Sequence, residues 1–252
     1  MTVLSAPRES TSPRFASAFA QGCGGRIVKV PTNAKLTGPI ALFGTALAWN
    51  QINSARADGR DWYYGDHAFL GKRGVHYRIS RNEFQYTGTA TAGGWTRFQN
   101  LHLSVKPWRK TGKNVLVCPA PAVHAALMGF DGKALEREMM TTLAAHTDRP
   151  LVLRYKATAT TPIEDALNDA WAVVTYHSNV AIQALMTGVP VFVMCPWAAT
   201  RRMAKSDLTE IESPYYPEDR EPFLSSLASH QWTMTEISQG LAWRALEAER
   251  AA

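Results

Sequence analysis

The clearest periodicity lies in the second half of the chain, where short apolar runs alternate with amphipathic stretches. Runs rich in Val, Leu and Ile predict buried strands, and stretches rich in Ala, Leu, Met and Glu predict helices. Strands are expected at residues 114–118, 150–154, 171–175 and 189–194, and helices at residues 132–146, 163–168 and 179–186. Strands that alternate with helices pair in parallel, so this half predicts a doubly wound α/β sheet.

The first half shows a shorter version of the same alternation. A helical stretch at residues 46–57 can be capped by Thr45, and residues 87–94 are rich in Thr, Ala and Gly, as loops are. Strands are expected at residues 26–30, 39–44, 62–65 and 76–80. Strand, helix and strand in this order predict parallel pairing with a right-handed crossover.

These two patterns predict an α/β fold with two small Rossmann-like units that face a cleft. A length of 252 residues suits two small domains. We expect an N-terminal unit over residues 1–112, a C-terminal unit over residues 113–222, and tail helices over residues 223–252 that pack back on the N-terminal unit. In this tail, Thr233 and Glu236 have the spacing of a capping box.

Charge is unevenly distributed. The chain has 27 Lys and Arg against 21 Asp and Glu, a net charge of +6, whereas residues 72–113 alone carry nine basic residues and one acidic residue. In this basic window aromatic side chains lie among the cations, which suits phosphates and stacked bases. The alternative is a solvated face whose aromatic residues turn into the core. The candidate acceptor contacts are Lys72, Arg73, Arg78, Arg81, Asn82, Arg97 and Arg109, together with the Gly44-Thr45 turn.

Several classes of protein are excluded by what the sequence lacks. The three cysteines have no CxxC spacing, which argues against a disulfide framework and a structural zinc site. No apolar run reaches the roughly 18 residues of a membrane helix, and the N-terminus lacks the apolar stretch of a secretory signal. There is no phosphate-binding P-loop, G-x-S-x-G elbow or H-E-x-x-H motif. We therefore expect a soluble, cytoplasmic protein.

The strongest motif is a strand, a polar turn and a helix at residues 172–191. The turn contains His177, Ser178 and Asn179, and the helix begins at Ser178 or Asn179. Unpaired N–H groups at a helix start bind anions, and open α/β sheets bind ligands beyond the carboxyl ends of their strands. The motif therefore predicts a phosphate site, although an ordinary turn with a capping serine has the same pattern.

This segment resembles the nucleotide-sugar-binding core of GT-B glycosyltransferases. It is most similar to the capsule polysaccharide and Kdo transferases and their phage relatives, in which a His/Ser turn precedes an A-x-x-A-L-x-x-G-x-P-V helix, here residues 181–191. The resemblance covers residues 114–195. It implies a nucleotide-sugar donor, with the donor diphosphate held by Arg154, Lys156, His177, Ser178 and Asn179. We expect no metal, because helix termini and cations already supply positive charge. Gln183 stands where many relatives have the glutamate that binds the ribose.

Asp66 and His67 follow a predicted strand of the first half, where an acceptor would be activated. An inverting sugar transfer needs a base that takes the proton of the acceptor hydroxyl. Either residue could serve, or Asp66 could orient His67. A retaining transfer needs no such base, so the sequence leaves the stereochemistry open. The plainer interpretation is a turn aspartate beside a packed histidine.

The resemblance and the basic window together predict sugar transfer to a hydroxyl group. The favoured acceptor is a hydroxymethylated pyrimidine in double-stranded DNA, as in phage DNA modification, in which case the protein acts in the host cytoplasm. One alternative is a capsule or lipid-linked glycan, whose enzymes use basic surfaces at anionic membranes. Another is a nucleic-acid-binding module that kept the fold without the chemistry. The oligomeric state cannot be predicted.

Overall fold

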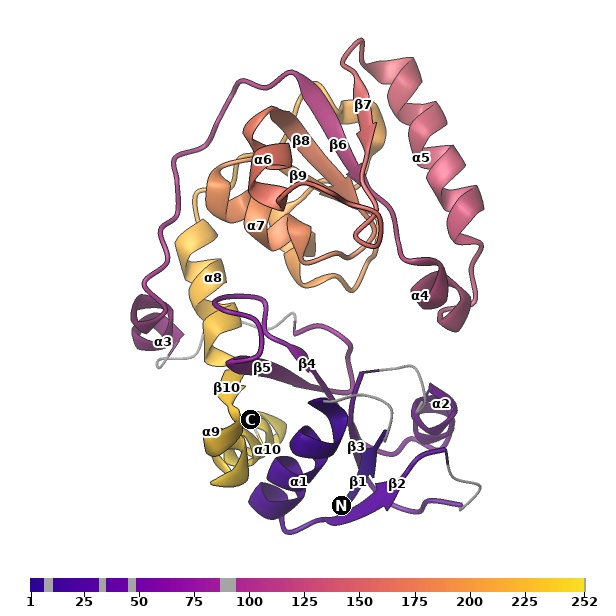
Figure 1. Cartoon of the computed structure of the whole chain (residues 1–252), viewed down its shortest axis with the longest axis vertical. Helices are drawn as coiled ribbons and strands as arrows, with labels where there is room; N and C mark the ends of the chain where they lie inside the picture. The colour runs from indigo at the N-terminus through magenta and orange to yellow at the C-terminus, as the bar shows by residue number, and fades with distance from the viewer. Residues whose placement is uncertain (7–10, 32–34, 45–48, 87–93, 252) are drawn as a thin grey trace. The chain divides into compact units, whose positions relative to one another are not determined.

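The chain folds into two α/β units (Figure 1). The computed structural model describes residues 1–6, 11–31, 35–44, 49–86 and 94–251. Unit 1 comprises Met1–Leu101 together with Ser225–Ala252, and unit 2 comprises His102–Leu224. The expected boundary after residue 112 falls inside unit 2, because the main-chain N–H groups of Lys106 and Arg109 donate to carbonyls at the end of a unit 2 helix.

Unit 2 contains a four-stranded parallel sheet in the order β7-β6-β8-β9. Its strands are β6 (Asn114–Cys118), β7 (Leu151–Leu153), β8 (Ala170–Thr175) and β9 (Val191–Val193). Its helices are α4 (Ala122–Leu127), α5 (Gly132–His146), α6 (Ile163–Asn168) and α7 (Val180–Thr187), followed by the 3-10 turns η1 (Ala199–Met203) and η2 (Leu208–Glu210). This arrangement confirms the predicted parallel α/β fold.

The ends of the unit 2 helices follow from single residues. The Asp131 carboxylate accepts the N–H groups of Lys133 and Ala134 and so caps α5. These two hydrogen bonds lower the pKa of Asp131. Helix α7 ends at Gly188, whose φ of 79° lies in the left-handed region that favours glycine.

Unit 1 contains a six-stranded sheet in the order β10-β5-β4-β3-β1-β2. Its strands are β1 (Thr2–Ser5), β2 (Arg26–Lys29), β3 (Ile40–Phe43), β4 (Trp62–His67), β5 (His76–Arg81) and β10 (Gln231–Thr233). Its helices are α1 (Thr11–Cys23), α2 (Trp49–Ala57), α3 (Gly94–Asn100), α9 (Met234–Ser238) and α10 (Leu241–Ala251), and α8 (Arg220–Ser229) begins in unit 2 and ends in unit 1. Strands β5 and β10 are antiparallel to their neighbours, and the other pairs are parallel.

The two units repeat one strand order without a repeated sequence. The four parallel strands of unit 1 run β2-β1-β3-β4, and those of unit 2 run β7-β6-β8-β9, so in both the second strand lies outside the first. The chain therefore reverses direction across the sheet between β1 and β3, and again between β6 and β8. In α/β sheets, ligands bind at the carboxyl ends of strands beside such a reversal.

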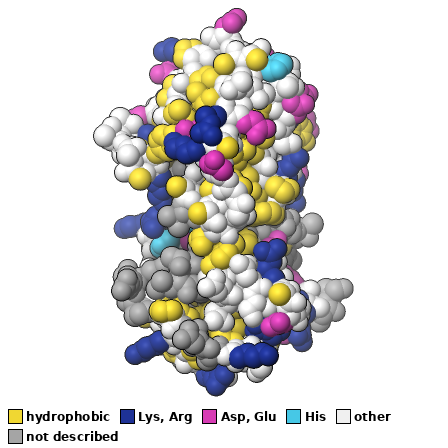
Figure 2. All heavy atoms as spheres, turned by 90° about the vertical axis from the view of Figure 1, so that its right-hand side faces the viewer, with side chains coloured by type: hydrophobic (Ala, Val, Ile, Leu, Met, Phe, Trp, Pro, Cys, Tyr) yellow, Lys and Arg dark blue, Asp and Glu magenta, His cyan; other side chains and the backbone are white. Residues whose placement is uncertain are grey.

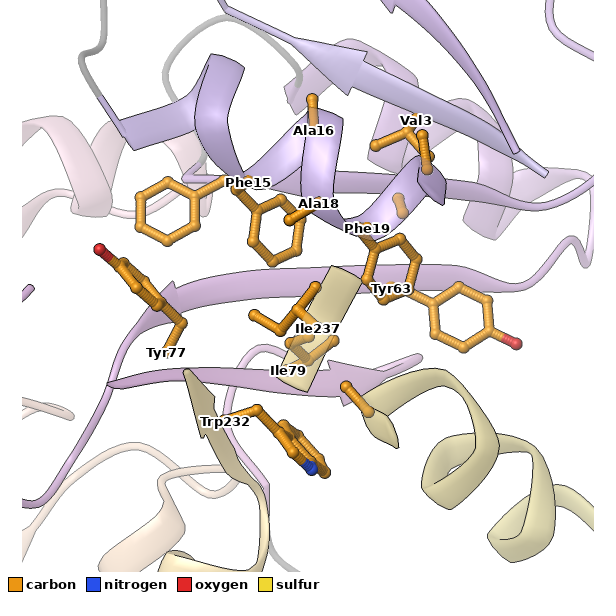
Figure 3. Close-up of a cluster of buried hydrophobic side chains, with 14 of the residues drawn as sticks. Val3, Phe15, Ala16, Ala18, Phe19, Tyr63, Tyr77, Ile79, Trp232 and Ile237 are labelled. Atoms are coloured by element: carbon orange, nitrogen blue, oxygen red, sulfur yellow. The ribbon is translucent and has the colours of Figure 1, made fainter. Parts of the chain in front are cut away.

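The C-terminal segment completes the core of unit 1. Figure 3 shows Phe15 and Phe19 pointing from α1 toward the sheet, with Tyr63 beside them and with Trp232 contributed by β10. The rings of Phe15 and Phe19 stack with their centroids 5.5 Å apart. At the start of α9 the predicted capping box is confirmed, because Thr233 and Glu236 bond each other's main-chain N–H groups.

Gly188 should not tolerate a side chain. A Cβ atom there would lie 2.0 Å from the Pro107 carbonyl oxygen, in addition to the strain of a left-handed alanine. We expect Gly188→Ala to lower the free energy of unfolding by about 2–5 kcal/mol. Gly129, also in unit 2, has a φ of 76° and no neighbour within 4 Å of its Cβ position. Gly129→Ala should therefore cost only about 1–2 kcal/mol in urea unfolding, and equal costs for the two variants would contradict the predicted clash.

Candidate functional site

The first candidate site lies at the carboxyl ends of β6, β8 and β9 in unit 2. The Thr175 hydroxyl donates to the Cys118 carbonyl oxygen at 2.7 Å and so ties together the ends of β6 and β8. Both residues are buried. The turn after β8 therefore lies at the edge of the sheet where the chain reverses direction, which is where α/β sheets generally bind ligands.

The turn after β8 has the geometry of a capped helix start. The main-chain N–H of Val180 donates to Ser178 Oγ at 3.3 Å, and that of Ala181 donates to the Ser178 carbonyl at 3.0 Å. The side chains of residues 176–179 are half-buried. Because Ser178 Oγ accepts the helix N–H through a lone pair, its own proton remains available to a ligand oxygen. Ser178 is therefore a capping serine that can also donate a hydrogen bond.

A cluster of rings surrounds this turn, and most of its members are absent from the sequence-based prediction. The ring centroid of His177 lies 5.6 Å from His124, 5.2 Å from Tyr176 and 5.1 Å from Trp197. Phe130 packs on Tyr176 at 4.7 Å. His124 follows β6 and Trp197 follows β9. Applying the carboxyl-end rule to every predicted strand, and not only to the motif strand, would have identified them.

The thiol and phenol beside the turn are uncharged at neutral pH. Burial raises the pKa of Cys195 to about 11 and that of Cys118 to about 11, the latter despite the nearby Arg154 cation. Burial, together with the neighbouring Cys195, raises the pKa of Tyr176 to about 12. None of these groups therefore repels an anionic ligand, and the two cysteines are buried core residues.

Arg154 and Lys156 lie beyond β7 and not within it. The Arg154 guanidinium donates to the Thr161 carbonyl at 2.5 Å and to the Thr161 hydroxyl at 3.2 Å. The main-chain N–H of Arg154 donates to the carbonyl of Val117 near the end of β6. Lys156 is exposed in the following turn. The strand predicted at residues 150–154 therefore ends at Leu153, before this pair. Gln183 lies half-buried in the first half of α7.

A shallow depression of about 760 Å³ lies at the opposite end of unit 2 and does not coincide with this turn. It is lined by residues 144–150, Lys113 and Glu212, next to the amino ends of β6 and β7. Three of its polar side chains are hydrogen-bonded to one another: Arg149 and Thr147 both donate to the Glu212 carboxylate. We assign it no ligand.

The second candidate site is the end of β4 in unit 1, where Asp66 and His67 are the last two strand residues. Asp66 Oδ1 accepts the main-chain N–H of His67 at 2.7 Å, and Oδ2 accepts a guanidinium N–H of Arg78 at 2.6 Å. The Asp66 side chain is 30% exposed. The His67 ring packs edge-on against Phe43 at 5.4 Å, with its Nδ1 buried. Both residues are half-buried, and the imidazole has one of its two ring nitrogens, Nδ1, buried.

Most predicted acceptor contacts of the basic window are engaged inside the protein. Arg78 is buried and pairs with Asp66, and Arg81 pairs with Asp61 at 2.9 Å. Arg97 pairs with Glu236 at 2.6 Å. Two further residues are also engaged: the Asn82 amide donates to Asp61, and the Arg109 guanidinium donates to the carbonyls of Leu167, Asn168 and Ala170.

The remaining predicted contacts divide into three cases. Lys72 and Arg73 are exposed. Gly44 follows β3 with a φ of 70°, and its N–H donates to the Gly65 carbonyl. Thr45 lies outside the described residues. The aromatic residues of the window are largely buried, as the alternative interpretation predicted, although Trp95 remains 45% exposed.

The basic window is also split between the two units, since Lys106, Arg109, Lys110 and Lys113 belong to unit 2. The net charge nevertheless lies entirely in one of them. Unit 1 carries 14 Lys and Arg against 8 Asp and Glu, whereas unit 2 carries 13 of each. In the face seen in Figure 2, basic and acidic side chains mix on unit 2, and mainly basic ones are in view on unit 1. The positive charge thus belongs to the unit that holds Asp66.

Two features bear on membranes and metals. Among the described residues, no helix combines the length and apolar content that a membrane crossing requires. Within those same ranges, His, Cys, Asp and Glu side chains nowhere gather in a group of three or more that could hold a metal ion.

The fold is mixed α/β and Rossmann-like, with parallel strands and helices in both units, and it matches the fold of two solved transferase structures. No protein-family model matches the sequence, and no curated protein does. The structure is similar to two transferases from Thermosulfurimonas dismutans. The first is KpsC, beta Kdo 2,4 transferase, with a TM-score of 0.53, 14% identity and 90% of each chain covered. The second is KpsC, beta Kdo 2,7 transferase, with a TM-score of 0.51, 11% identity, and 97% of this chain and 100% of that chain covered. At these identities the likeness is one of fold.

Proposed function

We propose that this chain is a glycosyltransferase that moves a sugar from a nucleotide-sugar donor to a hydroxyl acceptor. The observation that carries the proposal is the capped turn at His177 and Ser178, which lies at the carboxyl edge of a parallel sheet in a fold shared with two Kdo transferases. In this proposal unit 2 binds the donor, and unit 1 supplies the base.

The donor phosphate would lie at the start of α7. The Ser178 hydroxyl and the His177 ring would contact its oxygens at the positive end of the helix dipole, while the N–H groups of Ser178, Val180 and Ala181 keep their acceptors within the turn. Asn179 and Gln183 extend the polar surface toward the ribose. Arg154 and Lys156 would add positive charge for the departing nucleotide. Since these groups already stabilise the negative charge of the departing nucleotide, we propose that transfer needs no metal. EDTA should therefore not slow it.

Asp66 would act as the base. Its carboxylate would take the proton of the acceptor hydroxyl while the acceptor oxygen bonds to the anomeric carbon of the sugar. The bond from that carbon to the donor phosphate then breaks, and its electron pair leaves with the nucleotide. His67 is the second candidate for this role, and its ring packing on Phe43 is the reason for placing it second.

For the acceptor we favour a glycan over modified DNA. A DNA surface needs cations that reach phosphates, whereas Arg78, Arg81, Arg97 and Arg109 are each bonded to groups within their own unit. Lys72 and Arg73 remain exposed. Transfer to duplex DNA that contains 5-hydroxymethylcytosine, with salt-sensitive DNA binding, would return the preference to DNA.

Nucleotide binding tests the proposal directly. One of a panel of UDP-, GDP-, dTDP- and CMP-linked sugars should stabilise the chain, because a ligand that binds only the folded state shifts unfolding. At a concentration of about 100 times its dissociation constant, the stabilisation is about 2.7 kcal/mol, or roughly 5–10 °C in melting temperature. No shift with any member of the panel would refute the proposal.

Variants of two proposed donor contacts locate the binding site. Ser178→Ala and Lys156→Ala should each weaken donor binding about 10–100-fold, the value of a hydrogen bond to a charged group. Lys110→Ala is the matched control, because it removes an exposed cation of unit 2 at the other end of α7. The neighbouring main-chain N–H of Arg109 donates to the carbonyl of Gly188, which follows the last residue of that helix. Equal losses in all three variants would indicate attraction by overall charge and not a site at the turn.

A further inference from the structure

Arg78 is a buried cation directly beside the proposed base. Along β5, Tyr77 and Ile79 point into the core formed with α1, so the alternation of a strand directs Arg78 to the other face of the sheet. In the antiparallel pairing of β4 with β5, Arg78 lies opposite Asp66. Only 6% of Arg78 is exposed. The sheet register thus places a water-excluded guanidinium next to the Asp66 carboxylate.

The guanidinium has an acceptor on each of its three nitrogens. Nη2 donates to Asp66 Oδ2 at 2.6 Å, Nε to the His67 carbonyl at 3.0 Å, and Nη1 to the Phe84 carbonyl at 2.7 Å. The Phe69 ring lies 4.3 Å from its central carbon. Burying a cation is costly unless its N–H groups are satisfied, and this arrangement satisfies them with three separate groups.

Two of these contacts hold consecutive residues at the end of β4. The guanidinium binds the side chain of Asp66 and the carbonyl of His67, and the His67 N–H donates back to Asp66 Oδ1 at 2.7 Å. Each carboxylate oxygen therefore has a donor that fixes its direction. A lysine in place of Arg78 would keep the charge but lacks the planar fork that reaches three acceptors at once.

We propose that Arg78 is a positioning residue for sugar transfer, which holds the Asp66 carboxylate in the one orientation that accepts the proton of the acceptor hydroxyl. This assignment rests on the proposed glycosyltransferase function. It replaces the sequence-based expectation that Arg78 contacts the acceptor itself, because a guanidinium that is 6% exposed and bonded on three sides cannot also bind an acceptor phosphate.

The test is Arg78→Lys, measured as steady-state nucleotide release from whichever UDP-, GDP-, dTDP- or CMP-linked sugar stabilises the wild type. We expect kcat to fall about 10–100-fold, because a displaced catalytic group costs about that much, while KM for the donor stays unchanged. Arg60→Lys is the matched control. Arg60 is also in unit 1 and mostly buried, and it donates to Asp58, Ser54 and the Gly38 carbonyl, away from the end of β4. It should keep the wild-type kcat.

A double variant separates positioning from simple support of the fold. In an Asp66→Asn background, Arg78→Lys should lower kcat no further, because Arg78 acts through Asp66. A purely structural role would lower activity in both backgrounds. If Arg78→Lys does not fold, Phe69→Leu keeps all three hydrogen bonds and removes the ring over the guanidinium, and it should lower kcat about 2–10-fold at unchanged KM.

The outcomes distinguish the two proposals. A wild type that neither binds nor turns over any donor of the panel overturns the glycosyltransferase function and the role of Arg78 with it. A wild type that turns over a donor, together with a folded Arg78→Lys variant of equal kcat, overturns the role of Arg78 alone. Where Arg78→Lys does not fold, a Phe69→Leu variant with the wild-type kcat likewise overturns the role of Arg78 alone.

Discussion

Replacing Asp66 by asparagine is expected to slow sugar transfer about 10²–10⁴-fold while donor binding stays near that of the wild type. The amide keeps the shape of the side chain and cannot take a proton from the acceptor hydroxyl. Donor binding should persist because the donor contacts proposed above all lie in unit 2. The measurement is kcat for nucleotide release or transfer, normalised to the folded fraction, since Asp66 also pairs with the buried Arg78.

His67→Gln is the companion variant, because it replaces the neighbouring candidate base and leaves the carboxylate in place. We expect a much smaller loss of kcat than in Asp66→Asn. The reverse order, with a large loss in His67→Gln and a small one in Asp66→Asn, would assign the base to His67. Wild-type turnover in both variants would rule out a base at the end of β4 and favour a transfer that needs none.

Truncating Trp232 to alanine is expected to lower the free energy of unfolding by about 3–5 kcal/mol. Trp232 is 2% exposed and lies in the core that joins α1, the sheet and the C-terminal helices. Its removal leaves a large cavity in this core, which the surrounding side chains cannot fill. Since whole domains are stable by only about 5–15 kcal/mol, this variant should unfold at markedly lower urea concentration.

Trp95→Ala is the control for that measurement, because it removes the same side chain from the same unit at a site that is 45% exposed. Its cost should stay within about 0.5 kcal/mol, as surface substitutions usually do. A loss for Trp232→Ala no larger than that of Trp95→Ala would mean that β10 does not contribute to the core of unit 1.

Unit 2 is the part of the fold that its sequence predicts best. The predicted helices at residues 132–146 and 163–168 coincide with α5 and α6. Both begin at local signals, the capping carboxylate of Asp131 and the proline at 162, and both are bounded by apolar strand runs. Where local signals and the hydrophobic period agree, tertiary context changes little.

Unit 1 was predicted less completely, because its missing elements depend on distant partners. Strands β1 and β10 have only four and three residues, and each gains its place from a neighbour far away in sequence. Helix α1 is rich in Ser and Ala, and its core contacts rest mainly on Phe15 and Phe19. Short segments of this kind carry too few apolar positions for periodicity to identify them.

The candidate sites divide in the same way. Asp66 and His67 were located correctly at a strand end, because the strand pattern of residues 62–65 is local. The burial of Arg78 was not predicted, since Tyr77, Arg78 and Ile79 alternate as in a half-exposed strand. Phe69 and the main chain at Phe84 cover Arg78, and that covering comes from turns whose path the sequence pattern does not determine.

The discontinuous path of unit 1 has a consequence for synthesis. Its sheet includes β10, so this edge strand, which pairs with β5, leaves the ribosome only after all of unit 2 has been made. Unit 2, by contrast, is one uninterrupted segment that can fold while translation continues. Of the two units, unit 1 is begun first and completed second, and until β10 is made the Phe15 and Phe19 side of its nascent sheet lacks Trp232 as a cover.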